Sequence, residues 1–584
     1  MSEGDPHGQT GAAEAAAARR RIPLGIDDFR TLRERGLEYV DKSQLIRELI
    51  DREGVQVVLL PRPRRFGKTL NLSMLRCFFE RRAEDLSSLF EGLHIWEAGE
   101  RYRAHFQRYP VIHMTFKGVK FETFDACWEG IRKKIELAYR EHRELLDGGH
   151  LGEAEARDFQ AILDGSAPMI VYVRALMDLS AYLHRRHGQE VVLLLDEYDE
   201  PIHAGYLHGY ADRILDFFRN FLTEGLKGNP HLYKAVLTGI LRVARESTFS
   251  GLNNLAVYSL LRSEFSESFG FTEAEVEQLL SRAGRAEHRA LVRAWYNGYV
   301  FGGRVVHNPW SILSFAASED GLLRGYWLAT SANDLVRDLL QHHAIGIEAE
   351  METLLDGGSI ERRLDEYVAL GELRENEDAL WSLLVFSGYL RAEPGAGPPG
   401  EEPPYRLSIP NREVREIYTS TFQRWMEARL QGGGGSLKQL TAALLRGDAE
   451  AFEAELQAFV TAVLSVHDLG HAGRIAPERV YQAFLVGLLA TLEPAYQVRS
   501  NRESGRGRPD VVIRPTRAGS PGVVLELKVA RRSRKTLDQA LEEGLAQIRS
   551  RDYAAELRAD GATPVHAMAV AFDGKAVRVR SADG

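Results

Sequence analysis

The chain has 584 residues, of which 44% are hydrophobic and 27% charged, and its formal net charge is −9. This length exceeds what one hydrophobic core usually supports and predicts about three or four domains. The negative net charge argues against a protein that is coated in nucleic acid, and no apolar run approaches the roughly 20 residues of a membrane-spanning helix.

The N-terminal segment 1–21 is polar and Ala-rich, and its arginines follow the alanine run. A secretory signal places basic residues ahead of an apolar run, so this order predicts a disordered tail instead. The two cysteines, Cys77 and Cys127, show no metal-ligand spacing. We expect both to be buried thiols of a cytoplasmic protein.

Strand and helix patterns alternate through the first half of the chain. Strands are predicted at 55–60, 109–116, 190–196 and 233–240, and helices from Lys68, near 123–145 and near 209–226. The third strand is a continuous apolar run that ends in an acid, which is typical of a strand buried on both faces of a parallel sheet. The alternation predicts an α/β domain over residues 22–271.

The second half of the chain reads differently. Periodicity is mostly helical over 272–430, which predicts a helical lid or middle region, and the run QGGGGS at 431–436 is typical of a flexible linker. Residues 437–584 then form a last predicted domain that begins with helices. Its later predicted elements are strands at 496–500, 509–514 and 522–528, a helix at 536–551 and a strand pair within 564–580.

A nucleotide-binding motif lies where the first strand meets its helix. Its predicted nucleotide-binding residues are Arg62, Pro63, Arg64, Arg65, Phe66, Gly67, Lys68 and Thr69. The pattern is that of a phosphate-binding P-loop, except that an arginine replaces the first glycine. Gly67 would let the backbone approach phosphate, Lys68 would contact the β- and γ-phosphates, and Thr69 would bind Mg²⁺. The helix N-terminus adds favourable partial charge.

The acidic end of the third strand supplies the second half of the predicted site. Asp196 ends the strand, as the acid that supports Mg²⁺ does in such sites, and Glu197 would polarise the attacking water. An acidic strand end that caps a helix is the competing interpretation, and the P-loop upstream favours the nucleotide site. Asp199 and Glu200 are expected to be turn or capping residues.

Four residues at or after the end of the fourth predicted strand each have two interpretations. Thr238 and Gly239 would place a polar side chain beside the γ-phosphate, or they form a plain turn. Arg242 and Arg245 would contact phosphate, or they pair with surface acids.

Five further residues raise the question of contacts with a base. Asp41 and Lys42 would contact adenine or ribose, although a local helix cap is the commoner role for such residues. Trp295, Tyr296 and Trp310 would stack on nucleic-acid bases, although aromatic residues in helical sequence more often belong to a core.

The C-terminal domain contains a second candidate site. Asp510 begins one strand, and Glu526 and Lys528 lie two residues apart on the next strand, so they point to the same face. The two acids would hold Mg²⁺ for phosphodiester hydrolysis, and the lysine would position or deprotonate the nucleophile. A cross-strand ion pair is the alternative. Glu503 would be a further ligand or a solvated residue, and Gln547 would brace the site or lie on a helix surface.

A local excess of positive charge surrounds this site. Between Arg499 and Lys535 the chain has eleven Lys or Arg residues and three acids. Phosphate contacts require such an excess, so nucleic acid, with DNA as the first expectation, is the predicted partner. A solvated basic surface would give the same count.

Several segments resemble the AAA-ATPase-like family of bacterial proteins. They read IPLGIDDFRTLRERGLEYVDKSQLIRELI, RPRRFGKTLNLSML, LLLDEYDEP, LTGILRVARESTFSGLNNL, WYNGYVFGG, HNPWSIL and LLVFSGYL. The segments YQAFLVGLLATL, ESGRGRPDVVI, LELK and AQIRSRDY resemble the PD-(D/E)XK nuclease-superfamily domain that is usually fused to that ATPase. Together they cover about residues 22–580, and the arginine at the first P-loop position is what this family shows.

The resemblance implies a P-loop ATPase core, a helical lid and an α/β nuclease-like fold, with ATP and Mg²⁺ as cofactors. It carries nucleotide binding over to Lys68, Thr69, Asp196 and Glu197, and nuclease chemistry to Asp510, Glu526 and Lys528. The leading hypothesis is Mg²⁺-dependent cleavage of DNA gated by ATP, which would suit defence against foreign DNA. The alternative is a regulatory ATPase switch whose C-terminal fold only binds nucleic acid or a protein. Homo-oligomers are also expected, because such ATPases often complete their site with a neighbour's arginine.

Overall fold

The computed structural model divides the chain into two compact units, Met1–Leu339 with Glu361–Val414, and Leu340–Ile360 with Arg415–Gly584. It describes residues 21–147, 149–241, 254–327, 334–343, 347–355, 357–367, 370–396, 403–419, 437–463, 485, 488–489, 492, 495–500, 509–530, 535–551, 554–573 and 576–582. Within these ranges no helix is long and apolar enough to cross a membrane. The predicted linker 431–436 lies outside them, so a domain boundary there stays a prediction.

A parallel five-stranded sheet forms the centre of the first unit. Its strands are β1 (Val57–Pro61), β2 (Val111–Thr115), β3 (Val191–Asp196), β4 (Leu232–Gly239) and β5 (Leu255–Val257). The order is β2-β3-β4-β1-β5, so β4 separates the strand that leads into the P-loop from the strand that ends in Asp196. Every residue of β1 and β3 is buried, and for β3 this confirms the burial predicted from its continuous apolar run. The carboxyl ends of parallel strands meet at one edge, and the candidate nucleotide residues gather there.

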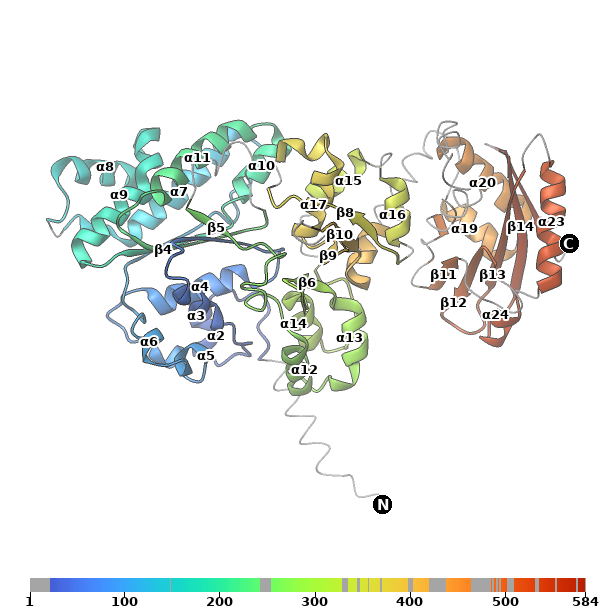
Figure 1. Ribbon diagram of the computed structural model, residues 1–584, viewed down its shortest axis with the longest axis horizontal. Helices are drawn as coiled ribbons and strands as arrows, with labels where there is room; N and C mark the ends of the chain where they lie inside the picture. The colour runs from blue at the N-terminus through green and yellow to red at the C-terminus, as the bar shows by residue number, and fades with distance from the viewer. Residues whose placement is uncertain are drawn as a thin grey trace, which may run out of the picture. The chain divides into compact units, whose positions relative to one another are not determined.

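Helices cover both faces of this sheet, as Figure 1 shows. One group is α7 (Phe124–Glu141), α8 (Glu153–Leu163), α9 (Met169–His187), α10 (Glu200–His208) and α11 (Ala211–Leu226). The other is α2 (Phe29–Glu34), α3 (Gln44–Asp51), α4 (Lys68–Phe79), α5 (His94–Glu97) and α6 (Glu100–Arg103). The sequence pattern did not predict α10, which has a proline in its first turn, or the three-residue strand β5.

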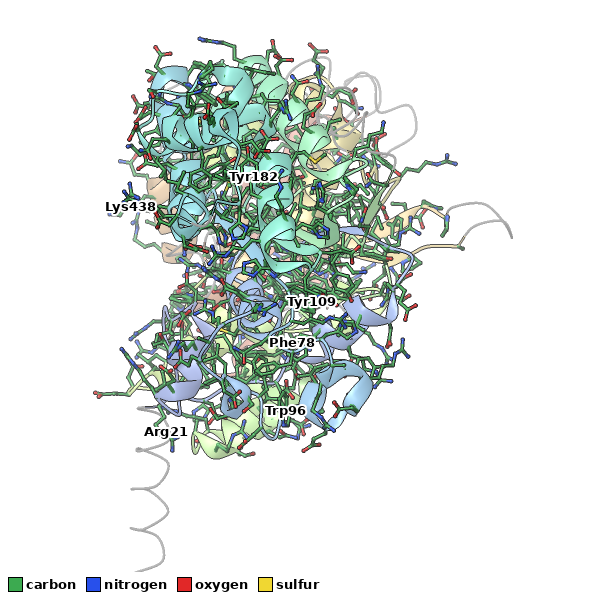
Figure 2. The ribbon with its side chains drawn as sticks, turned by 90° about the vertical axis from the view of Figure 1, so that its left-hand side faces the viewer. Arg21, Phe78, Trp96, Tyr109, Tyr182 and Lys438 are labelled. Atoms are coloured by element: carbon green, nitrogen blue, oxygen red, sulfur yellow. The ribbon has the colours of Figure 1, made fainter. Side chains whose placement is uncertain are left out.

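Aromatic residues fill the space beside α4. The ring centroids of Phe78, Phe90, Trp96 and Phe106 lie 5.1–5.6 Å apart in neighbouring pairs, mostly edge to face. Figure 2 labels Phe78 and Trp96 in this cluster. The cluster anchors α4, whose N-terminus follows the P-loop directly. Cys77, also on α4, is a buried free thiol like Cys127, as predicted.

The middle region contains more than the predicted helices. Its helices are α12 (Glu273–Arg282), α13 (Arg289–Tyr296), α14 (Pro309–Ala317), α15 (Asp334–His342) and α17 (Glu377–Phe386). Its strands are the hairpin β6 (Tyr299–Phe301) and β7 (Arg304–Val306), and a sheet of β8 (Ile360–Arg362), β10 (Tyr405–Ser408) and β9 (Arg391–Pro394). Strands of three or four residues are too short to show an alternating pattern, so helical periodicity masked them.

The second unit contains a mixed sheet with the order β11-β12-β13-β14-β15, in which β13 and β14 are parallel and the other neighbours antiparallel. The strands are β11 (Tyr496–Ser500), β12 (Val511–Pro515), β13 (Gly522–Val529), β14 (Val565–Asp573) and β15 (Ala576–Ser581). The helices are α16 (Glu348–Leu355), α19 (Leu437–Arg446), α20 (Ala449–Val463), α23 (Leu537–Arg551) and α24 (Ala555–Ala559). Apolar side chains of α23 pack on β13 and β14. The predicted α/β class is confirmed for both units.

Candidate nucleotide and nuclease sites

The P-loop joins Pro61 to the first residue of α4. Gly67, with φ at 85°, is the N-cap of that helix, and this left-handed conformation favours glycine. The Lys68 ammonium is buried and donates to the carbonyls of Arg62 and Pro63, each at 3.1 Å. Burial lowers the pKa of Lys68, and the nearby Glu197 carboxylate opposes that shift. The lysine is therefore held inside the loop that would surround a phosphate chain.

The side chain of Arg62, the arginine that replaces the first glycine of the P-loop pattern, makes buried contacts within the protein. The Arg62 guanidinium is fully buried and donates to the carbonyls of Pro61, Tyr258 and Phe265 at 2.8, 2.7 and 3.1 Å. It also lies 5.1 Å from the ring centroid of Phe269. These contacts direct the side chain away from the predicted nucleotide position. Its prediction as a nucleotide contact is thus not supported by its geometry.

Two other P-loop side chains pack against the middle region. Phe66 lies 5.0 Å from the Tyr299 ring and 5.2 Å from the Phe301 ring, measured between centroids. A Cβ added to Gly388 would approach the Cβ of Pro63 to 3.0 Å, so only glycine fits closely there. Phe66 and Pro63, which stand where a glycine-rich loop would have small residues, therefore connect the P-loop to β6 and to the turn after α17.

Asp196 accepts a hydrogen bond on each carboxylate oxygen. The Thr69 hydroxyl donates to Oδ2 at 2.7 Å, and the Thr238 hydroxyl donates to Oδ1 at 2.6 Å. The position of β4 between β1 and β3 puts Thr238 beside Asp196. Thr238 lies within β4 and orients the acid through this bond, and its contact with the γ-phosphate stays a prediction. Gly239 leaves room for Asp199, whose Oδ1 would lie 2.7 Å from an added Cβ.

Glu197 follows Asp196 in a left-handed conformation with φ at 49°. Its side chain lines the same cavity as Lys68 and Thr69. Burial raises the pKa of Glu197 to about 7, and the Lys68 ammonium partly offsets this rise. A carboxyl group with a pKa near neutrality is suited to accept a proton from water.

The next two acids hold backbone segments. Asp199 Oδ2 accepts from the amides of Ile240 and Leu241 at 2.7 and 3.1 Å, so it caps the chain after β4, and its side chain does not cap α10. Glu200 Oε2 accepts from the Gly118 amide at 2.6 Å, at the loop after β2. The capping role predicted for these acids therefore serves segments distant in sequence.

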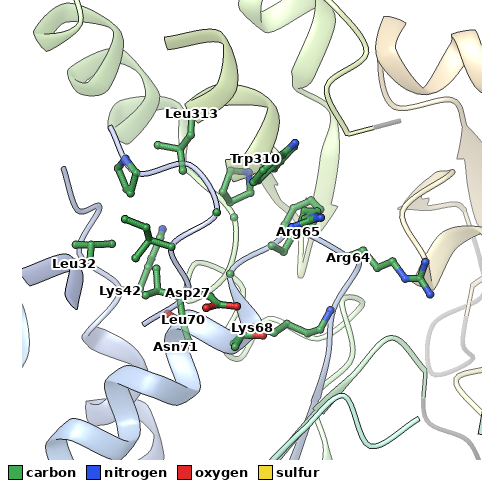
Figure 3. A pocket seen from close by; sticks show the side chains of 18 of the residues that line it. Asp27, Leu32, Lys42, Arg64, Arg65, Lys68, Leu70, Asn71, Trp310 and Leu313 are labelled. Atoms are coloured by element: carbon green, nitrogen blue, oxygen red, sulfur yellow. The ribbon is translucent and has the colours of Figure 1, made fainter. Parts of the chain in front are cut away.

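A cavity of about 510 Å³ is lined by the P-loop residues Arg64 to Thr69, by Glu197 and by residues of other segments. Figure 3 shows the side chains of some of the residues that line it. The sequence analysis missed several of them, namely Asp27, Lys117, Lys120, Pro309 and Leu313. Lys117 donates to Asp27 at 2.7 Å. Lys117 lies two residues after the end of β2, and this position could have indicated it, because ligands bind at the carboxyl ends of parallel strands.

Residues with a predicted base contact divide into two groups. Asp41 accepts from the amides of Ser43 and His94 at 2.8 Å each, so it connects the segment before α3 to the first residue of α5, 53 positions away. Tyr296 is buried in the core of the middle region, where Trp295 packs beside it. Lys42, which ion-pairs with Glu275 at 2.8 Å, and Trp310 both line the nucleotide cavity.

The predicted nuclease residues meet on β12 and β13. Asp510 directly precedes β12, and its Oδ2 accepts from the Leu527 amide at 2.7 Å. Lys528 donates to Glu526 Oε1 at 2.8 Å. Glu526 Oε2 is buried and has no hydrogen-bond partner within the described ranges. Burial raises the pKa of Asp510, and it raises the pKa of Glu526 to about 7, with Asp510 adding to the rise.

These features fit a divalent cation. A buried carboxylate oxygen without a partner is costly, and a cation would satisfy it. No group of three or more His, Cys, Asp or Glu side chains among the described residues could hold a metal ion. Two carboxylates suffice for Mg²⁺, which usually keeps several water ligands.

Helix α23 covers this site. A Cβ added to Gly544 would lie 3.6 Å from Lys528 Cγ, so the helix approaches the lysine closely. Gln547 follows one turn later on the same helix and is half-buried. Arg551, one more turn along, lowers the pKa of Glu526 by its charge, and sequence reasoning did not select it. Glu503, Arg242 and Arg245 lie outside the described residues.

Two family models match separate parts of the chain. Residues 23–249 match a family model described as "Predicted AAA-ATPase", and residues 476–582 match one described as "PD-(D/E)XK nuclease superfamily". A protein of Azotobacter chroococcum mcd 1, named "Uncharacterized protein in vnfD 5'region", is 28% identical over 562 residues, which cover 95% of this chain and 97% of that protein. The resemblance inferred from the motifs is therefore confirmed: the chain contains an AAA-ATPase-like domain followed by a PD-(D/E)XK nuclease-superfamily domain.

Proposed function

We propose that the protein hydrolyses ATP at the P-loop and that its C-terminal domain is a Mg²⁺-dependent nuclease that cleaves DNA under the control of that ATPase. The observation that carries the proposal is that each domain assembles two acids and a lysine, separately, in a buried setting. They are Asp196, Glu197 and Lys68 in one, and Asp510, Glu526 and Lys528 in the other. A binding module alone has no use for the second set.

In the ATPase, Lys68 would neutralise charge on the β- and γ-phosphates. Thr69 and Asp196 would hold Mg²⁺. The Thr238 hydroxyl, which donates a hydrogen bond to Asp196, would keep that acid oriented. Glu197 would accept the proton of the attacking water, and its pKa of about 7 suits this role at neutral pH.

In the nuclease, Asp510 and Glu526 would hold Mg²⁺. The metal would activate water and stabilise the negative charge that develops on the phosphodiester. Lys528, bonded to Glu526, would position the nucleophile or take its proton. The excess of Lys and Arg over acids between Arg499 and Lys535 would attract the DNA backbone and supply affinity without sequence preference.

The test is cleavage of plasmid and single-stranded DNA by the full chain with Mg²⁺, with and without ATP. Three variants are compared: Lys68→Ala, Asp510→Asn and, as a control, Asp538→Asn, whose side chain is 81% exposed on α23. We expect Asp510→Asn to abolish cleavage, Lys68→Ala to abolish its dependence on ATP, and the control to behave as wild type. Cleavage by Asp510→Asn at the wild-type rate would overturn the nuclease proposal. ATP binding without any cleavage would favour the regulatory switch.

A further inference from the structure

The charges of the nuclease site oppose the approach of its proposed substrate. Asp510 and Glu526 contribute two carboxylates, whereas Lys528 contributes one ammonium, which donates to Glu526 at 2.8 Å. The Lys528 side chain is 12% exposed, so most of it is enclosed beside that acid. A DNA strand carries further phosphates on both sides of the scissile one, and the acids repel them. A cationic side chain at the rim of the site would therefore improve DNA binding.

Helix α23 has two flanks that face different strands of the sheet. On one flank, Glu542 and Asp538 pair with Arg580 of β15, at 2.6 and 3.7 Å. On the other flank, a Cβ added to Gly544 would lie 3.6 Å from Lys528 Cγ on β13. Since β14 separates β13 from β15, the flank that contains Gly544 is the one that adjoins the metal site.

Helical periodicity assigns the two arginines at the end of α23 to opposite flanks. Successive residues of an α-helix are rotated by about 100°, so residues seven apart differ by only about 20°. Arg551 follows Gly544 by seven residues and therefore lies on the flank over β13. Arg549 follows Glu542 by seven residues and therefore lies on the flank over β15. Both arginines are exposed, so they differ mainly in the direction of the side chain.

The charge of Arg551 acts on the metal site. Burial raises the pKa of Glu526 to about 7, and the nearby Arg551 guanidinium opposes that rise. A guanidinium close enough to stabilise this carboxylate is also close enough to attract an anion that is bound beside it. Arginine presents a planar fork of N–H donors that matches two oxygens of one phosphate. Because Arg551 is exposed, such a phosphate would reach it from solvent.

We propose that Arg551 binds a backbone phosphate next to the scissile one and thereby places the DNA strand over Asp510 and Glu526. The inference rests on the proposed nuclease function, because it requires DNA at this site. It adds a direction to that function, since the strand would pass along the β13 flank of α23 and would not contact Arg549. The contact would add affinity without sequence preference, because every nucleotide has the same phosphate.

The test measures binding of a short labelled DNA duplex to the full chain, by fluorescence anisotropy without Mg²⁺, over a series of salt concentrations. Arg551→Gln should weaken binding about tenfold, because it removes a charge-assisted hydrogen bond. It should also lower the slope of log Kd against log salt concentration by about 0.9, the value for one phosphate contact. Arg549→Gln, the matched control on the same helix, should leave both quantities unchanged. Arg551→Lys should keep the slope, because it keeps the charge.

Cleavage with Mg²⁺ provides a second measurement. Arg551→Gln should raise KM for DNA about tenfold with a smaller change in kcat, because the substrate contact is lost while the metal-binding acids remain. An unchanged melting temperature shows that each variant folds.

The outcomes separate this inference from the proposed function. If Arg551→Gln binds DNA with the affinity and salt slope of wild type while wild type cleaves DNA, the phosphate contact is overturned and the nuclease stands. If Arg549→Gln lowers the slope as much as Arg551→Gln, the assignment to one flank is overturned. If only Arg551→Gln lowers the slope but wild type does not cleave, the contact is supported and the nuclease activity is overturned. If wild type neither binds nor cleaves DNA, both are overturned.

Discussion

The two candidate sites use the same residue types but differ in how completely their own bonds satisfy them. In the nucleotide site, Asp196 receives a threonine hydroxyl on each oxygen, and Lys68 donates to two loop carbonyls. In the nuclease site, Glu526 is paired with Lys528 through one oxygen, whereas the other is buried without a partner in the described part of the chain. The nucleotide-site side chains are thus held by bonds within the protein, whereas Glu526 Oε2 in the nuclease site lacks a bond that a cation would supply.

The largest effect is expected for a substitution in the nucleotide site. Glu197→Gln should reduce ATP turnover by about 10²–10⁴-fold, because a general base contributes on that order. ATP binding should persist, because Lys68, Thr69 and Asp196 are unchanged. Steady-state phosphate release and calorimetry measure the two quantities. Glu224→Gln, exposed on α11, is the control, and turnover near wild type in Glu197→Gln would contradict the assigned role.

A second substitution tests whether the unpaired oxygen of Glu526 binds Mg²⁺. Glu526→Gln removes a carboxylate proposed to bind Mg²⁺ and should reduce DNA cleavage by at least about 100-fold. It should also remove any rise in the melting temperature that Mg²⁺ causes, since a bound ligand stabilises the folded state. Glu450→Gln, at an exposed position of α20, should retain both properties. An equal Mg²⁺-induced rise in the two variants would place the metal elsewhere.

The pH dependence of metal binding sharpens the comparison further. Proton and metal compete for Glu526, and burial raises its pKa to about 7 in the folded protein. The side chain is mostly protonated at pH 6 and mostly ionised at pH 8, so the Mg²⁺ concentration for half-maximal cleavage should fall by about tenfold between these values. A Mg²⁺ titration of cleavage at each pH measures this fall. A flat profile would mean that Glu526 is ionised throughout.

The smallest effect concerns a single hydroxyl. Thr238→Val keeps the shape of the side chain but leaves Asp196 Oδ1 buried with one hydrogen bond fewer. We expect a loss of about 1–3 kcal/mol in the free energy of unfolding, measured in urea, with weaker ATP turnover. Thr223→Val is the matched control, because the buried Thr223 hydroxyl has no hydrogen-bond partner among the described residues. That variant should be neutral or slightly more stable. Equal losses in both variants would contradict the role of Thr238.

Sequence alone predicted the strands that position both sites, because their residues show long apolar runs or lie beside motifs. Strand β3 begins and ends within one residue of the predicted 190–196, and the acids and lysines at the centre of each site were identified. Short-range patterns could not reveal contacts between distant segments. Thr238 was ambiguous until the strand order placed β4 between β1 and β3. Lys117 matches no motif, and Asp27 and Leu313 lie within segments that carry the family resemblance but have no chemical signature of their own. Arg62 was included among the predicted nucleotide-binding residues because a motif gives position in sequence, not the direction of a side chain.

The burial of Arg62 has a consequence for the synthesis of the chain. Its guanidinium requires the carbonyls of Tyr258 and Phe265, which lie 196 and 203 residues further along. A nascent chain that ends at residue 249, where the matched ATPase domain ends, contains neither carbonyl and lacks the Phe269 and Phe301 rings as well. The P-loop sequence is thus translated early, but its mature conformation is completed only after the first part of the middle region has left the ribosome.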